Sequence, residues 1–176
     1  MHPINVLTDE HRTMEKMLGH LCSFTGRVKR QKTDGRATMA EFISFLRIFD
    51  KVHHMKEEDL LFAAMERNGF PKSGGPVAVM LSDHAVCRNL VGKMDEAARL
   101  AEPWTDAQRD SVDRVACEYR DYLGAHIQKE DGILYPMARQ AIPPDQWSEM
   151  ERQFPEFDAR QPMDEFKRLM EKLSVY

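Results

Sequence analysis

Apolar residues recur every three or four positions along most of the chain, which is the period of an amphipathic α-helix. Groups of turn-forming residues interrupt this pattern at residues 32–35, 68–76, 102–104 and 142–144. No segment alternates apolar and polar residues as a half-buried strand does. The pattern therefore predicts four long helices, at about 4–31, 39–67, 76–101 and 106–140. Short connections between such helices are typical of an antiparallel up-down four-helix bundle, so the predicted fold class is all-α.

Two of these helices begin with the spacing of a capping box, Thr38 with Glu41 and Thr105 with Gln108. In that motif the hydroxyl accepts a hydrogen bond from a free backbone N–H, while the third residue reaches back to the cap. Late in the fourth helix, Pro136 is predicted to kink or end it.

Beyond residue 144 the helical pattern weakens. Two short helices are predicted at 145–154 and 163–173, separated by Pro155 and Pro162. We therefore divide the chain into a bundle, residues 1–142, and a C-terminal helical extension, residues 143–176. The sequence does not indicate the role of the extension.

The composition excludes several classes of protein. A net charge of −4 over 176 residues argues against a dedicated nucleic-acid binder. No run approaches the roughly 18 apolar residues of a membrane span. The first residues lack a basic region followed by an apolar stretch, so no signal peptide is visible. The three cysteines are far apart and form no CxxC motif, which disfavours a disulfide framework or a zinc knuckle. We therefore expect a cytoplasmic protein.

Two segments rich in ligand-type residues form an internal repeat. Residues 53–62 and 126–135 share the pattern H-x-x-K-E-[ED]-x-[LI]-L-[FY], and the second segment begins 73 residues after the first. The same offset relates His11 to His84. Each half of the predicted bundle therefore carries one separate histidine and one HxxxE pair.

Histidine and glutamate at positions i and i+4 lie on one face of a helix. His53 shares its face with Leu46 and Phe49, so Glu57 is predicted to point into the core. The competing pair, His54 with Glu58, runs through polar positions and is predicted to face outward. The other candidates also lie on apolar stripes. Six side chains are therefore predicted to converge on the bundle interior: His11, His53, Glu57, His84, His126 and Glu130.

A single inward histidine is more often a hydrogen-bonded core residue than a metal ligand. Four imidazoles and two carboxylates in one apolar interior are different, because unpaired buried charge is too costly without compensation. No lysine or arginine lies on the stripes of His53 or His126, and Arg88 is the nearest candidate. A metal site is therefore favoured. Tyr122, one turn before His126, and Glu15, four residues after His11, are further candidates for which a plain structural role fits better.

This arrangement resembles the hemerythrin-like family, the HHE cation-binding domains, over about residues 4–140. The family places a histidine on helix one, HxxxE on helix two, a histidine on helix three and a histidine–carboxylate pair on helix four. The resemblance implies a non-haem centre of two iron ions bridged by Glu57 and Glu130. Imidazole and carboxylate without thiolate also suit iron, manganese or zinc. We expect iron, with zinc and manganese as alternatives.

The sequence departs from the oxygen-carrying members of that family. These have HxxxH on helix three, where this chain has Arg88, and a longer histidine-to-aspartate spacing on helix four. If both glutamates and a solvent oxygen (oxide or hydroxide) bridge the ions, two histidines and three shared oxygens would leave one open position on each iron, where a carrier leaves one in total. The four-His, two-Glu set is similar to iron-centre repair proteins and to hemerythrin-like proteins linked with oxidative stress. Repair proteins usually carry an N-terminal cysteine-containing domain, whereas this sequence starts with the first helix, which makes the assignment to repair proteins less favoured.

The leading hypothesis is a cytoplasmic di-iron protein that binds or reduces oxygen, nitric oxide or peroxide. The alternative is an iron-binding or sensing module without turnover, in which the C-terminal segment contacts a protein partner or a second copy. Apolar residues near Trp147 and Phe154 are predicted to face outward and to serve such a dimer. A structural zinc bundle, which would be colourless, is a third reading.

Overall fold

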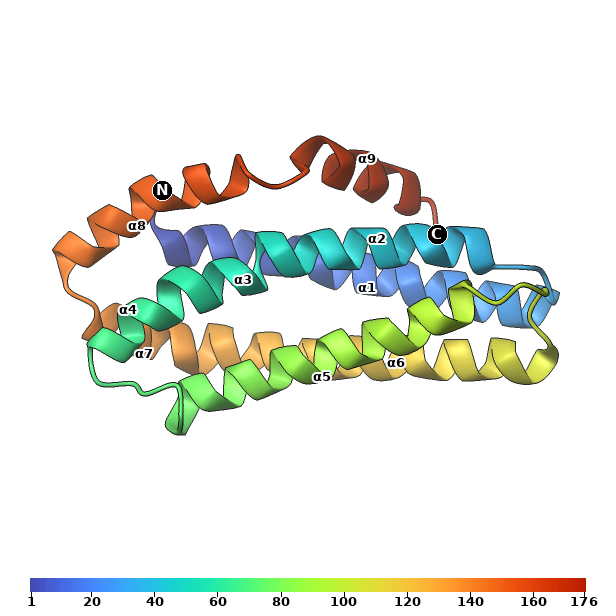
Figure 1. Cartoon of the computed structure of the whole chain (residues 1–176), viewed down its shortest axis with the longest axis horizontal. Helices are drawn as coiled ribbons and strands as arrows, with labels where there is room; N and C mark the ends of the chain where they lie inside the picture. Colours follow the sequence, from blue (N-terminus) through green and yellow to red (C-terminus); the bar gives the residue numbers. More distant parts are fainter.

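Four long helical rods run antiparallel around shared apolar cores in the computed structural model, which describes residues 1–176 (Figure 1). The first rod is α1 (Pro3–Gln31) and the third is α5 (Gly75–Ala98). The second rod consists of α2 (Arg36–Val52), α3 (His54–Lys56), η1 (Glu57–Leu61) and α4 (Phe62–Arg67). The fourth consists of α6 (Asp106–Lys129), η2 (Glu130–Leu134) and α7 (Tyr135–Ala141). The chain contains no strand, and the prediction of an all-α bundle is confirmed.

The second and fourth rods each contain a five-residue π-helical segment, η1 and η2, that begins at a glutamate of the repeat. Such segments are rare and are frequent at functional sites. The second rod is also interrupted at His53, whose backbone angles are φ −106° and ψ −71°. The predicted uninterrupted helices 39–67 and 106–140 are therefore wrong in detail. The repeat in the sequence is also a repeat in backbone geometry.

The helix termini agree only partly with the predicted caps. Thr105 and Gln108 form the predicted capping box at the start of α6. The second rod instead begins at Arg36, after Gly35, and Thr38 lies inside α2. A side chain at Gly35 would come within 2.8 Å of the Trp104 ring, so glycine permits the close approach of this turn. Pro136 lies in the first turn of α7, where its missing N–H costs little.

The C-terminal segment forms α8 (Pro144–Asp158) and α9 (Met163–Leu173), which lie along α1 and α2 (Figure 1). Pro155 lies inside α8 and does not end it. Trp147 and Phe154 are buried against the chain's own bundle. The prediction that these side chains face outward is therefore wrong.

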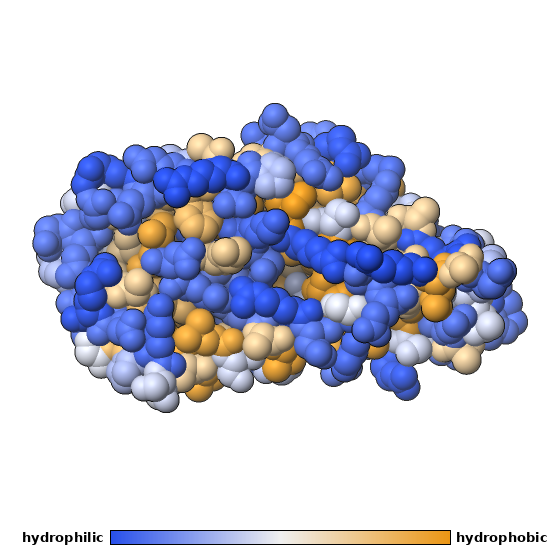
Figure 2. Space-filling model, viewed as in Figure 1, coloured by the Kyte–Doolittle hydropathy of each residue, from blue (hydrophilic) through white to orange (hydrophobic).

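Two apolar clusters fill the bundle, one at each end. The larger contains 26 buried residues, among them Met14 and Phe49, and the smaller contains 15, among them Leu7 and Leu61. A layer of buried polar side chains occupies the sequence positions between them on all four rods. The face in Figure 2 is mostly hydrophilic, with small apolar patches between charged side chains. No helix has both the length and the apolar character of a membrane span.

Candidate metal centre

The buried polar layer contains all six residues that the sequence predicts as metal ligands, and each is at most 1% exposed. Their donor atoms form two groups, within each of which the atoms lie within 4.8 Å of one another. We call the first group, His11 and His53 with both glutamates, the first position. The second position contains His84 and His126 with the same glutamates, Glu57 and Glu130. Two adjacent positions that share two carboxylates are the arrangement a dinuclear centre requires.

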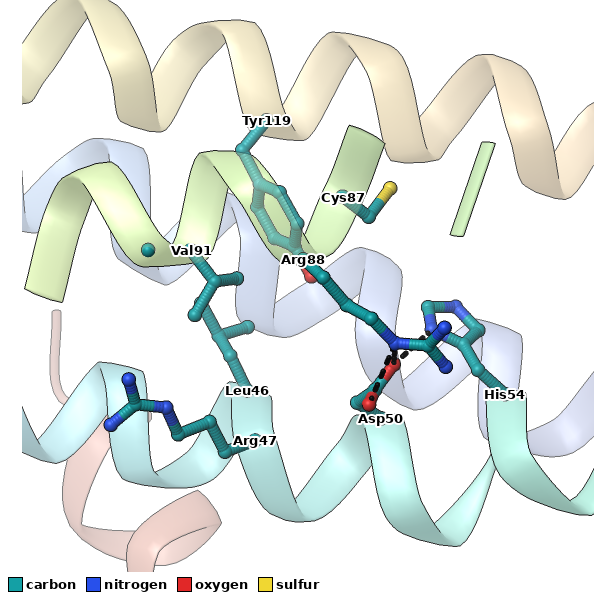
Figure 3. Close-up of a pocket in the computed structure, with 9 residues that line it drawn as sticks. Leu46, Arg47, Asp50, His54, Cys87, Arg88, Val91 and Tyr119 are labelled. Carbon is teal, nitrogen blue, oxygen red and sulfur yellow. Dashed lines mark hydrogen bonds and ion pairs between the residues drawn. The ribbon is translucent and has the colours of Figure 1, made fainter. Parts of the chain in front are cut away.

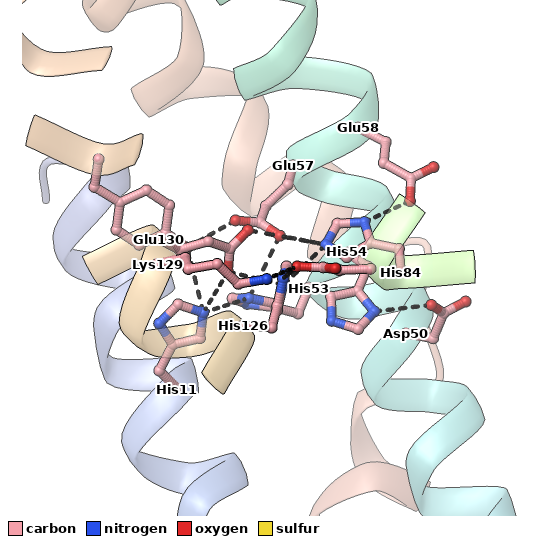
Figure 4. A network of polar contacts seen from close by, with 12 residues as sticks. His11, Asp50, His53, His54, Glu57, Glu58, His84, His126, Lys129 and Glu130 are labelled. Atoms are coloured by element: carbon pink, nitrogen blue, oxygen red, sulfur yellow. Dashed lines mark hydrogen bonds and ion pairs between the residues drawn. The ribbon is translucent and has the colours of Figure 1, made fainter. Parts of the chain in front are cut away.

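The histidines of each position face each other through their Nε2 atoms (Figure 4). The two Nε2 atoms are 2.9 Å apart for His11 and His53, and 3.2 Å apart for His84 and His126. Glu130 Oε2 lies 3.2 Å from Nε2 of His11 and 3.1 Å from Nε2 of His126. Despite these short distances, neither carboxylate oxygen of Glu130 has a hydrogen-bond partner, and nor does Oε2 of Glu57.

The opposite ring nitrogen of each of these histidines, Nδ1, contacts a carboxylate from another rod. The Nδ1–oxygen distances are 2.9 Å for His11–Asp131, 2.8 Å for His53–Glu10, 2.7 Å for His84–Glu58 and 3.3 Å for His126–Asp83. An ionised carboxylate only accepts, so it takes the Nδ1–H of a neutral imidazole and leaves a lone pair on Nε2. Lone pairs that face each other at 2.9 Å repel unless a proton or a metal ion lies between them. The residues present therefore fit a pair of metal ions.

Each of the four outer carboxylates is paired with a basic side chain. The pairs are Arg12–Asp131, Lys56–Glu10, Arg88–Glu58 and Lys129–Asp83. Each of these carboxylates, and each of the two lysines, has an equivalent residue 73 positions away in the other half of the repeat, whereas the two arginines have none. Lys56 is fully buried, which its pairing with Glu10 and Asp158 makes tolerable. In the sequence, these carboxylates and lysines were indicated by the Lys-Glu-acid segment of the repeat and by the acidic residue that directly precedes His11 and His84.

The electrostatics of the layer favour added positive charge. Burial, together with the neighbouring Glu130, raises the pKa of Glu57 well above its ordinary value. Burial lowers the pKa of His53 well below its ordinary value. Burial also opposes charge on His11, but the nearby carboxylates of Asp131 and Glu130 raise its pKa to about 9. The carboxylates therefore attract a cation to the space between the imidazoles.

The two positions differ at the last residue of the repeated phrase. Tyr135 follows η2, and its hydroxyl donates to Glu57 Oε1 at 2.7 Å and lies 3.3 Å from Nε2 of His11. The equivalent residue after η1 is Phe62, whose ring stacks on His84 with centroids 5.8 Å apart. The first position therefore has a phenol beside it where the second has an apolar ring. The repeated phrase does not indicate this role of Tyr135.

His54 is also part of the buried layer, contrary to the prediction that it faces outward with Glu58. Its side chain is 2% exposed, its Nδ1 lies 3.0 Å from Asp50, and its ring stacks on His84 with centroids 4.0 Å apart. Glu58 is half-buried and bonds His84. The prediction failed because it assumed a regular helical period across residues 53–61, where the helix is interrupted and then π-helical.

Two other predicted candidates lie away from the metal positions. The Tyr122 hydroxyl donates to Asp83 at 2.8 Å, so Tyr122 supports an outer carboxylate and contacts no ligand atom of the two positions. Glu15 is exposed and pairs with Arg12 at 2.6 Å. This position agrees with the plain structural role that the sequence favours for Glu15.

A cavity of about 230 Å³ lies between α2 and α5 on the side of the second position (Figure 3). Its lining includes His54, Asp50, Cys87 and Arg88. Since Arg88 is 39% exposed and His54 is buried, the cavity connects the protein surface to the edge of the polar layer. It is large enough for a molecule of a few atoms.

Comparison with known proteins agrees with this geometry. The hemerythrin HHE cation-binding domain matches residues 2–138, a range that contains all four rods except the last residues of the fourth, 139–141. The iron-sulfur cluster repair protein YtfE of Salmonella typhimurium is 26% identical over 132 residues, which cover 74% of this chain and 60% of that protein. The chain thus spans about 60% of the length of this relative.

Proposed function

The chain belongs to the hemerythrin HHE cation-binding domain family, and from this premise we propose that it is a di-iron protein that binds or reduces a small ligand such as oxygen, nitric oxide or peroxide. His11 and His53 would hold one ion, His84 and His126 the other, and Glu57 and Glu130 would bridge them. The observation that carries the proposal is the pair of facing Nε2 atoms at each position, beside carboxylate oxygens that lack partners. Zinc or manganese would fit the same donors.

Iron in such a centre supplies Lewis acidity and one-electron redox chemistry when bound. The chain's own residues provide the surroundings for that chemistry. The outer carboxylates fix each imidazole with Nε2 free, and their basic partners neutralise them. The apolar clusters on either side exclude water from the layer. The Tyr135 hydroxyl offers a hydrogen bond beside the first position.

Iron quantitation with a visible spectrum on freshly purified, air-exposed protein tests this proposal. We expect about two irons per chain and the ligand-to-metal charge-transfer bands of a coupled ferric pair. A protein that stays colourless after anaerobic iron loading and exposure to air would contradict it and would favour zinc or a redox-silent scaffold. Peroxide and nitric oxide binding assays then separate the candidate ligands.

A sensing module without turnover is the second candidate, and one series of contacts favours it. Asp158, at the end of α8, accepts from Lys56 at 2.8 Å, and Lys56 donates to Glu10 at 2.6 Å. Glu10 in turn lies 2.8 Å from Nδ1 of His53. A change in the charge at the first position would therefore reach the C-terminal segment through adjoining polar groups. In this reading α8 and α9 change their docking and signal to a protein partner or a second copy.

Hydrogen exchange of α8 checks the sensing reading. Iron loading is expected to slow exchange in residues 144–158 several-fold in the wild-type protein, because the Asp158–Lys56 pair tightens the segment. Asp158→Asn should abolish that difference while iron content stays the same. Glu149→Gln, which changes an exposed carboxylate of α8 paired only with side chains of that helix, is the matched control. Equal exchange with and without iron in the wild type would contradict sensing and leave small-ligand binding intact.

A further inference from the structure

His54 lies in the buried layer but has no histidine as its equivalent in the second half of the internal repeat. The residue 73 positions later is Ile127, which packs in the larger apolar cluster. His54 is buried to the same degree but carries two polar nitrogens. Its Nδ1 contacts Asp50, whereas its Nε2 is buried and has no hydrogen-bond partner. A buried polar atom without a partner destabilises the folded protein. The presence of an imidazole at a position where the second half of the repeat has isoleucine therefore requires an explanation.

The orientation of His54 is fixed from outside the layer. Arg88 donates to Asp50 at 2.9 Å and to Glu58 at 2.8 Å, and these carboxylates contact Nδ1 of His54 and of His84 respectively (Figures 3 and 4). The Nδ1 atoms of both rings thus point toward one guanidinium. Because Asp50 accepts the Nδ1–H of a neutral imidazole, Nε2 of His54 presents a lone pair.

The stacking geometry excludes His54 and His84 as ligands of one ion in this arrangement. A metal ion binds an imidazole nitrogen in the plane of the ring. The two rings lie face to face, 4.0 Å apart and inclined by 20°, so one ion cannot lie in both planes. The donor atoms of His54, His84 and His126 still lie within 4.8 Å of one another. Because Nδ1 of His54 faces Asp50, the nitrogen left to face a small molecule at the second position is Nε2.

We propose that His54 accepts a hydrogen bond from a small ligand at the second position, and that this site therefore prefers ligands that carry O–H or N–H groups. Hydrogen peroxide belongs to that class, whereas dioxygen, nitric oxide and azide carry no hydrogen. The inference rests on the proposed function, because it needs an ion at the second position. The cavity lined by Asp50, Cys87 and Arg88 gives such a ligand a route to His54.

Titrations of the anaerobic diferrous protein with small ligands test this preference. Binding is followed by near-infrared magnetic circular dichroism. The probes are hydrazine, which has N–H groups, and azide, which has none. His54→Ile, which installs the residue of the other half, and His54→Phe, which keeps a ring on His84, should weaken hydrazine binding about fivefold, as loss of one hydrogen bond does. Azide affinity should stay within about twofold. Ile127→Val, the equivalent position of the other half, should change neither affinity.

Unchanged hydrazine binding in both His54 variants would overturn the proposal. A lower iron content or an altered iron spectrum in the His54 variants before any ligand is added would also overturn it, because His54 would then be a metal ligand. A wild-type protein that fails to hold two irons would instead refute the proposed function.

Discussion

Replacing Glu57 or Glu130 with alanine is expected to lower the iron content from about two ions per chain to one or none. Each carboxylate belongs to both metal positions, so either change removes a donor from both ions at once. It also halves the negative charge that offsets two divalent cations in a fully buried layer. Outer groups cannot move in to replace it, because Glu10, Glu58, Asp83 and Asp131 are held by their basic partners.

The same variants separate metal binding from folding. In the metal-free protein, burial and the neighbouring Glu130 raise the pKa of Glu57 well above its ordinary value, so its replacement removes a carboxyl group that is costly to ionise. The metal-free Glu57→Ala protein should therefore remain folded by circular dichroism while its iron content falls. Glu15→Ala is the control, since Glu15 has the i+4 spacing from His11 but lies exposed beside Arg12. If both core variants kept two irons and the wild-type spectrum, the assignment of these glutamates would be wrong.

The sequence was sufficient for features that depend on regular helical period. Residues 11 and 84 lie on uninterrupted helices, α1 and α5, and counting by 3.6 placed them inward correctly. His54 lies beyond an interruption of the second rod and just before a π-helical segment, where that count no longer holds. The error therefore arose at the point where the backbone departs from α-helix to form the centre.

Contacts between rods were the second kind of feature that the sequence could not give. Glu10 and Lys56 lie 46 positions apart, and Asp131 reaches His11 across 120 positions. A search for compensating charge along the ligand stripes could not find these partners, because each comes from a different rod. The repeat did indicate these partners, because the acidic residues and lysines that surround the ligands recur at the same offset as the ligands themselves. The burial of Trp147 was likewise set by α8 folding back on the bundle, which no local pattern indicates.

Removing the metal is expected to lower the melting temperature of the wild-type protein by roughly 8–16 °C. An ion that binds only the folded chain at about 1,000 times its dissociation constant adds about 4 kcal/mol to the free energy of unfolding. For a chain of 176 residues, each kcal/mol raises the melting temperature by about 2–4 °C. Differential scanning calorimetry of iron-loaded protein, compared with protein chelated under anaerobic reducing conditions, measures the shift.

The Glu57→Ala, Glu130→Ala double variant decides whether that shift comes from the centre. Its melting temperature should not respond to chelation, because it lacks both shared carboxylates. A wild-type protein that melts at the same temperature with and without iron would mean that the facing imidazoles are stable alone. In that case the repulsion between their Nε2 lone pairs could not be the reason the layer binds metal.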